Sequence, residues 1–121
     1  LDAGLASLLE ELSGRELLTR TVVFMATEFG RTPKLKSGSG RDHWSRAMSL
    51  VMAGGGIRGG QVIGRTTDKA EEPAEGPRSP EDVAASFYHA LGIDHHREYH
   101  TPTGRPVQLV RDGTILRELF V

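Results

Sequence analysis

Two short polar motifs carry the side chains best suited to chemistry in this sequence. Residues 27–32 place the carboxylate of Glu28 three positions before the guanidinium of Arg31, directly after an apolar run. A carboxylate oxygen is a good ligand for a hard cation, and a planar guanidinium matches the geometry of an oxyanion. The alternative is a surface ion pair between Glu28 and Arg31, because such pairs are common and weak.

The second motif is the densest polar cluster, Arg41-Asp42-His43-Trp44, which lies in a glycine-rich stretch before another apolar run. A neutral imidazole is a good zinc ligand, and a neighbouring acid orients it or neutralises charge. The alternative is structural: His43 and Trp44 would anchor a loop against a sheet while Asp42 bonds backbone amides. The sequence alone leaves both interpretations open.

Two further motifs are weaker. Residues 54–59, GGGIRG, match the glycine pattern of dinucleotide sites, but they lead into the β-like residues 61–63 and not into a helix. Without a helix N-terminus to receive a pyrophosphate, a tight structural loop is the better prediction. His95, His96 and His100 cluster after the last helix, where a solvated loop is predicted because Gly92 and Pro102 leave room for only a short helix.

Apolar spacing and turn residues predict the elements that position these motifs. Leucines at 1, 5, 8, 9 and 12 follow one helical face that ends near Gly14, and the start inside a helix predicts a longer parent protein. Ser79-Pro80-Glu81-Asp82 predicts a capped helix that Gly92 closes, with Val83, Phe87, Ala90 and Leu91 as its apolar stripe. Strands are predicted at residues 21–26, which should be buried on both faces, at 47–53 and at 61–63. Loops are predicted at 31–41 and 66–78, and short strands in the tail after 102.

Composition narrows the class of protein. The 121 residues have a formal charge of -1, so no excess of positive charge points to nucleic acid, and the chain has no cysteine for a disulfide, thiolate nucleophile or Cys-zinc site. No apolar run approaches the ~20 residues of a membrane-spanning helix. The order of strands and helices predicts an α/β layered sheet with flanking helices, and ligands bind outside the carboxyl ends of strands in such sheets.

Five motifs in order, TEFGRTPK, GRDHW, AGGGIRGGQVIG, SPEDVAASFYHALGID and TGRPV, resemble the bacterial family called domain of unknown function 1501. The resemblance spans nearly the whole chain. It implies an alkaline-phosphatase/sulfatase-like fold, of which residues 1–121 would be the C-terminal portion, with the N-terminal half and its nucleophile absent. It also implies export of the parent to the periplasm or the cell exterior, often by the twin-arginine route.

The resemblance implies specific roles for the two polar motifs. An Asp-His pair follows the corresponding strand in the superfamily and binds metal, whereas this chain has Glu28-Phe29 there; His43 matches a later histidine ligand. Glu28, Asp42 and His43 are therefore the candidate ligands of a divalent metal such as zinc, calcium or manganese, and Arg31 and Arg41 the candidate oxyanion-binding residues.

The leading hypothesis is a metal-dependent hydrolase of sulfate or phosphate esters, acting on a small molecule or a polysaccharide, and inactive as this chain alone. The alternative is an exported binding or assembly protein that keeps the fold without the chemistry, which Phe29 favours. Half of a sheet would expose edges and apolar faces, so self-association of the isolated chain is also expected.

Overall fold

The computed structural model describes residues 1–38 and 40–120, which divide into two compact units. The first comprises residues 1–23, 53–60 and 78–120, and the second comprises residues 24–52 and 61–77. Residue 39, in the loop predicted at 31–41, lies outside the described residues. No helix in the described part of the chain is long and apolar enough to cross a membrane.

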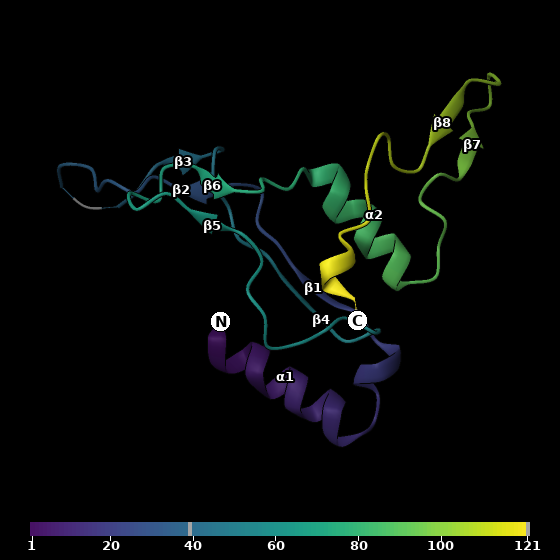
Figure 1. Ribbon diagram of the computed structural model, residues 1–121, viewed down its shortest axis with the longest axis horizontal. Helices are drawn as coiled ribbons and strands as arrows, with labels where there is room; N and C mark the ends of the chain where they lie inside the picture. Colours follow the sequence, from purple (N-terminus) through teal and green to yellow (C-terminus); the bar gives the residue numbers. More distant parts are fainter. Residues whose placement is uncertain (39, 121) are drawn as a thin grey trace. The chain divides into compact units, whose positions relative to one another are not determined.

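The described part of the chain combines two α-helices, two 3-10 helices and short strands, which can be followed in Figure 1. The first unit holds α1 (Asp2–Gly14), η1 (Leu18–Arg20), α2 (Pro80–Ala90), β7 (Glu98–His100), β8 (Pro106–Gln108) and η2 (Arg117–Leu119). The second holds β2 (Gly30–Arg31), β3 (His43–Trp44), β5 (Arg65–Thr66) and β6 (Pro73–Glu75). Strands β1 (Val23–Met25) and β4 (Val51–Ala53) each contribute residues to both units.

The described strands form four two-stranded sheets: β1-β4, β2-β3, β5-β6 and β7-β8. The last three pairs are antiparallel. Helices mixed with small strand pairs agree with the predicted α/β class in its broad sense.

Both predicted helices are present, but their burial differs from expectation. In α1, Leu5, Leu9 and Leu12 are half-buried, and no residue of the helix is fully buried. In α2 the fully buried residues are Ala85 and Ser86, whereas Leu91 of the predicted stripe is exposed. Val83, Phe87 and Ala90 of the stripe are half-buried, so the prediction was wrong only at Leu91. The most buried face of α2 runs through Ala85 and Ser86, and Ser86 takes part in a hydrogen-bond network.

Helix α2 begins with the predicted capping box. The Ser79 hydroxyl accepts a hydrogen bond from the Asp82 amide, and the Asp82 carboxylate accepts one from the Ser79 amide, both at 3.0 Å. Pro80 occupies the first turn, where its missing N–H costs nothing. These bonds satisfy amides that the first turn of a helix leaves without partners.

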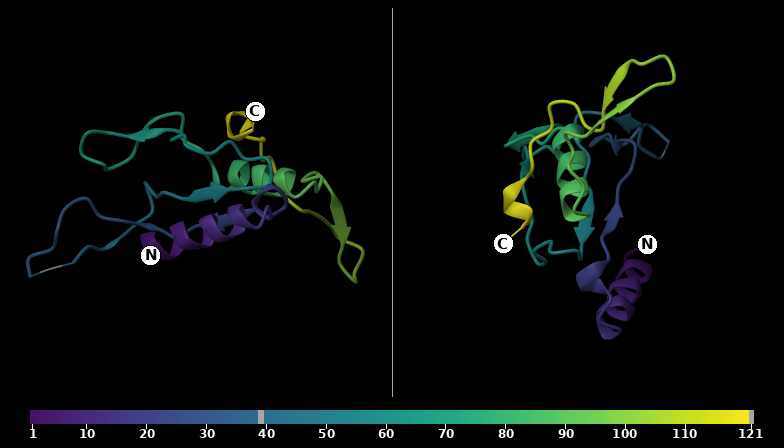
Figure 2. Two further views of the ribbon diagram at one scale, coloured as in Figure 1. Left: turned by 90° about the horizontal axis from the view of Figure 1, so that it is seen from below. Right: turned by 90° about the vertical axis from the view of Figure 1, so that its right-hand side faces the viewer.

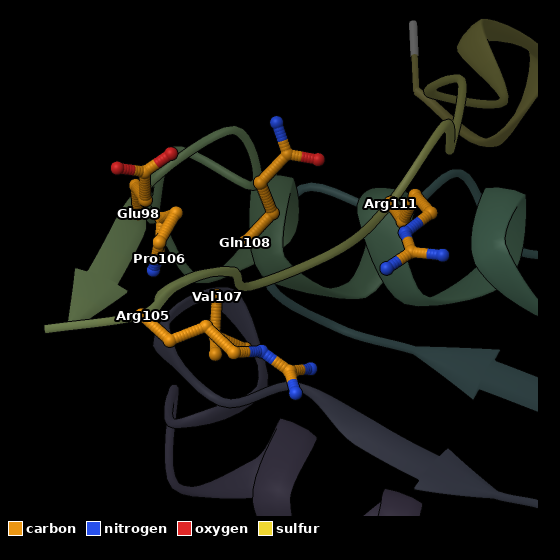
Figure 3. A pocket seen from close by; sticks show the side chains of 6 residues that line it. All are labelled: Glu98, Arg105, Pro106, Val107, Gln108 and Arg111. Atoms are coloured by element: carbon orange, nitrogen blue, oxygen red, sulfur yellow. The ribbon is translucent and has the colours of Figure 1, made fainter. Parts of the chain in front are cut away.

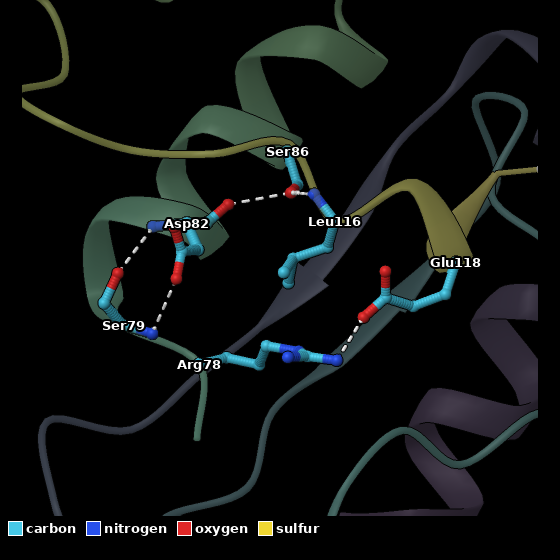
Figure 4. A network of polar contacts seen from close by, with 6 residues as sticks. All are labelled: Arg78, Ser79, Asp82, Ser86, Leu116 and Glu118. Atoms are coloured by element: carbon cyan, nitrogen blue, oxygen red, sulfur yellow. Dashed lines mark hydrogen bonds and ion pairs between the residues drawn. The ribbon is translucent and has the colours of Figure 1, made fainter. Parts of the chain in front are cut away.

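Asp82 and Ser86 also bind the C-terminal segment, which runs beside α2 in both views of Figure 2. The Thr114 amide donates to Asp82 Oδ1 at 2.8 Å, and the Leu116 amide donates to Ser86 Oγ at 2.8 Å. Ser86 Oγ in turn donates to the Asp82 carbonyl at 2.7 Å (Figure 4). An ion pair between Arg78 and Glu118 at 2.5 Å lies in the same region.

One predicted strand and one predicted loop differ from the structure. Residues 61–63 form no strand, and Val62 is 94% exposed. The reason is local: Gly60 and Gly64 both have positive φ, and they interrupt extended backbone on each side of this short segment. The predicted connection 66–78 instead contains β6, which pairs with β5 across an irregular register.

The strand predicted at 21–26 shortens to β1 and is not buried on both faces, since its central residue Phe24 is 40% exposed. The strand predicted at 47–53 likewise shortens to β4. A strand is buried on both faces only when other elements pack on both sides of its sheet, and the exposure of Phe24 shows that one face of β1 is not covered in this way.

The glycine-rich segment after β4 is the predicted loop, and no helix starts there. Gly54, Gly55 and Gly56 all have positive φ. A Cβ on Gly54 would lie 2.1 Å from the Thr21 carbonyl oxygen, so this position requires glycine. The geometry agrees with a structural loop and removes the helix N-terminus that a dinucleotide site would need.

We expect Ser86→Ala to lower the free energy of unfolding by about 1–3 kcal/mol, because it leaves the Leu116 amide without its acceptor in a part-buried position. Urea denaturation measures the change, with the exposed Ser49→Ala as control. A Ser86→Ala variant as stable as the control would show that the network contributes nothing.

Asp82 should make stability depend on pH. Its carboxyl pKa lies below the ordinary value, first because of the Thr114 amide and then because of the Ser79 hydrogen bonds. A lowered folded-state pKa stabilises the fold above the unfolded pKa of about 3.9, and that stabilisation is lost as pH falls through the folded value.

The free energy of unfolding, measured by denaturant from about pH 6 to 2.5, should therefore fall less steeply in Asp82→Asn than in the wild type. Asp68→Asn, at an exposed carboxylate, is the matched control and should keep the wild-type slope. Parallel curves for wild type and Asp82→Asn would contradict the prediction.

Candidate functional site

The β2-β3 hairpin places the two polar motifs side by side. Arg31 pairs with His43 and Gly30 with Trp44 in the antiparallel register. The Thr32 amide donates to the Asp42 carbonyl at 3.0 Å, and the Asp42 amide donates to Thr32 Oγ1 at 3.1 Å, so the ladder continues past both strands. Backbone pairing thus holds together motifs that are separated by a loop in the sequence.

His43 packs against Phe29. Their rings stack with centroids 3.7 Å apart and an interplanar angle of 24°, and the Arg31 guanidinium lies 5.4 Å from the Phe29 centroid. This contact fixes the orientation of an otherwise exposed imidazole. Stacking covers a face of the ring, whereas metal binding uses the in-plane nitrogen lone pairs, so the contact does not by itself prevent ligation.

Arg31 and Arg41 brace the hairpin through backbone carbonyls. Arg31 Nη1 donates to the Arg41 carbonyl at 3.3 Å, and Arg41 Nη1 donates to the carbonyls of Thr32 at 2.7 Å and Pro33 at 2.5 Å. Neither guanidinium forms an ion pair with a carboxylate within the described residues. Their charges therefore remain available to an anion even though part of their hydrogen-bonding capacity is used.

The two candidate carboxylates differ in their surroundings. Asp42 forms an ion pair with Lys36, with Oδ1 and Nζ 2.7 Å apart, and both side chains are more than half exposed. Glu28 is exposed and lies one residue before the Phe29-His43 stack. The alternative interpretation of this motif, a surface ion pair between Glu28 and Arg31, is not observed.

Trp44 takes part in anchoring the hairpin within its unit. Its indole Nε1 donates to the Glu71 carbonyl at 2.7 Å, and the Arg46 guanidinium lies 5.7 Å from its ring centroid. The structural interpretation of Trp44 therefore agrees with the observed contacts. That role does not exclude ligation by the adjacent His43.

The described residues do not provide a complete metal site by themselves. Nowhere in residues 1–38 and 40–120 do three or more His, Asp or Glu side chains gather as a metal would require. Zinc takes three or four protein ligands, and calcium takes six or more oxygens. Glu28, Asp42 and His43 fit at most a partial ligand set. If Glu28 and His43 share a metal, we predict that their polar atoms approach within ~4–6 Å of each other when it is bound.

The histidines after α2 require one correction. His95 is 6% exposed and not solvated, with its ring centroid 4.0 Å from that of His96 and its carbonyl bonded to the Val110 amide. The Asp94 carboxylate accepts from the His96 amide at 2.9 Å, and this local turn accompanies the burial of His95. His96 and His100 are exposed, but His100 lies in β7 and not in the predicted loop.

A shallow pocket of about 400 Å³ borders the β7-β8 hairpin (Figure 3). Its lining comprises Glu98, Arg105, Pro106, Val107, Gln108 and Arg111. The guanidiniums of Arg105 and Arg111 lie apart in Figure 3 and do not converge on one point. None of the predicted site residues lines this pocket.

Gly30 lets the chain pass closely beside the segment after β3. An added Cβ would lie 1.8 Å from the Ala47 carbonyl oxygen and 3.2 Å from that of Trp44. We expect Gly30→Ala to lower the free energy of unfolding by about 1–3 kcal/mol, because the backbone must move to relieve the clash. Gly59→Ala, where an added Cβ meets nothing within 4 Å, is the control. Equal thermal midpoints for the two variants would argue against this close approach.

Comparisons with known proteins give one match. The family model described as Protein of unknown function (DUF1501) covers residues 1–120. No curated protein and no solved structure matches the chain. Since the match extends over almost the whole sequence, this chain belongs to the DUF1501 family.

Proposed function

We propose that the protein containing this chain is a metal-dependent hydrolase of sulfate or phosphate esters, built on an alkaline-phosphatase/sulfatase-like layered sheet. The observation that carries the proposal is the register of β2 with β3, which pairs Arg31 with His43. An imidazole and unpaired guanidiniums thereby share one short hairpin. Charge stabilisation of a transferring phosphoryl or sulfuryl group commonly combines a metal with arginine.

Each candidate residue has a distinct role in this proposal. His43 and Glu28 would hold part of the ligand set of zinc, calcium or manganese, with Asp42 as a further carboxylate, and other ligands would come from outside the described residues. The metal, when bound, would activate the nucleophile and screen negative charge. Arg31 and Arg41 would hold the ester oxyanion, and Phe29 would keep the His43 ring in a fixed orientation.

A second candidate function has its own support. An exported, non-catalytic binding or assembly protein would need the hairpin only as a rigid surface, which suits the Phe29-His43 stack and the Lys36-Asp42 ion pair. The two functions differ in what the rest of the parent protein must contain. A hydroxyl or thiol nucleophile with nearby aspartates favours the hydrolase, and their absence favours the binding protein.

The isolated chain should also self-associate, as exposed apolar residues occur in several elements. Phe24 in β1, Leu8 in α1 and Met48 before β4 are 40%, 47% and 45% exposed. Exposed apolar surface of this kind favours association with other chains. The partner is proposed to be a second copy when the chain is produced alone.

The hydrolase proposal predicts turnover of aryl sulfate or aryl phosphate by the full-length protein when zinc, calcium or manganese is supplied. His43→Ala should reduce metal affinity and turnover by at least about 10- to 100-fold, the loss found even for residues that only support a ligand. The isolated 121-residue chain should show no turnover, because it offers no activated nucleophile.

The control is His100→Ala, at an exposed histidine of the β7-β8 hairpin, which should keep full activity. Chromogenic esters with each metal in turn provide the measurement. Full activity in His43→Ala would remove that residue from the site. If the full-length protein shows no turnover with any of the three metals, the non-catalytic binding function is favoured.

A further inference from the structure

The segment around β2 and β3 is locally basic although the chain as a whole is not. Residues 28–46 contain five Lys or Arg and two acidic side chains, a formal excess of three positive charges, whereas the whole chain has a net charge of -1. The cationic side chains are Arg31, Lys34, Lys36, Arg41 and Arg46. We call these five residues the basic hairpin.

Most of these charges have no carboxylate partner. Lys36 is paired with Asp42, but Arg31, Lys34, Arg41 and Arg46 form no ion pair within the described residues. The neighbouring β5-β6 hairpin contrasts with this, because Arg65 is paired with Glu75 and residues 61–77 contain more acids than bases. The positive charge is therefore specific to the β2-β3 part of the unit.

The basic hairpin is also partly ordered before any ligand arrives. Backbone carbonyls hold the guanidiniums of Arg31 and Arg41, and Arg46 lies over the Trp44 ring. Side chains that are already restricted lose less conformational entropy on binding, so each contact retains more of its favourable energy. All four unpaired cations belong to exposed residues.

We propose that the basic hairpin binds a polysaccharide bearing repeated sulfate or carboxylate groups. Single exposed charge contacts are weak, and cations distributed over one strand, a loop and a flanking residue gain affinity when one polysaccharide chain engages several of them. The polysaccharide would be the substrate of the proposed hydrolase, so this inference rests on the proposed function. Binding itself is tested without turnover, so the two ideas can fail separately.

The aromatic residues argue against single-stranded nucleic acid as the ligand. Such sites use open aromatic faces on which bases stack. Here Phe29 is stacked on His43 and lies near Arg31, and the half-buried Trp44 is hydrogen-bonded and lies under Arg46. The hairpin thus presents charge more than stacking surface, which suits a sugar chain recognised through its anionic groups.

The test uses the full-length protein and measures binding to dextran sulfate, to neutral dextran of equal length and to a single-stranded DNA oligonucleotide. The Lys34→Ala/Arg46→Ala double variant removes two unpaired cations that have no assigned catalytic role. The Arg65→Ala/Lys69→Ala double variant removes the same charge from the β5-β6 hairpin of the same unit. Thermal unfolding confirms that both variants fold.

We expect the wild type to bind dextran sulfate and not neutral dextran, with an affinity that falls as salt rises. The Lys34/Arg46 variant should bind about tenfold more weakly and show a shallower salt dependence, whereas the Arg65/Lys69 variant should stay within about twofold of the wild type. Four outcomes would each overturn the proposal. They are an equal loss of affinity in both variants, tighter binding of the wild type to DNA than to dextran sulfate, full competition by equimolar inorganic sulfate, and no binding to dextran sulfate.

Discussion

The hydrogen bonds of Asp82 and Ser86 are the interactions on which the first unit most depends. Hydrophobic burial is limited there, because Ala85 and Val110 are the buried hydrophobic residues among those described. The Asp82 carboxylate caps α2 and also binds the Thr114 amide, while Ser86 binds the Leu116 amide. Two side chains on one helix thus hold the C-terminal segment. The two short hydrogen bonds of Ser86 Oγ offset the free-energy cost of removing this buried hydroxyl from water.

The candidate site depends on a different kind of constraint, the backbone pairing of β2 with β3. Pairing fixes which residues face each other, and the loop carbonyls then fix two arginines that a surface hairpin would otherwise leave disordered. Stacking on Phe29 does the same for His43. The chemical groups of the site are therefore ordered by local interactions inside a single hairpin, before any contribution from elsewhere in the protein.

Several predictions that depend on a few adjacent residues were confirmed, whereas several predictions of burial, which depend on residues distant in the sequence, were wrong. The capping box at Ser79, the end of α1 near Gly14 and the glycine loop at 54–56 each follow from a few adjacent residues. The burial of β1, of Leu91 and of His95 depends on partners distant in sequence, and these three predictions were wrong. The pairing of Arg31 with His43 had no signal beyond the proximity of two motifs, since hairpin register depends on the intervening loop.

The four two-stranded sheets have a topological consequence: every strand in the described part of the chain is an edge strand. Each has one side that a neighbour occupies and another side whose amides and carbonyls can accept a further strand. Growth into a wider sheet therefore requires only the addition of strands alongside those present, and no existing pair has to open. The same open sides make the chain prone to irregular strand addition, so mutation of an exposed edge to a charged residue or proline is the rational route to a well-behaved sample.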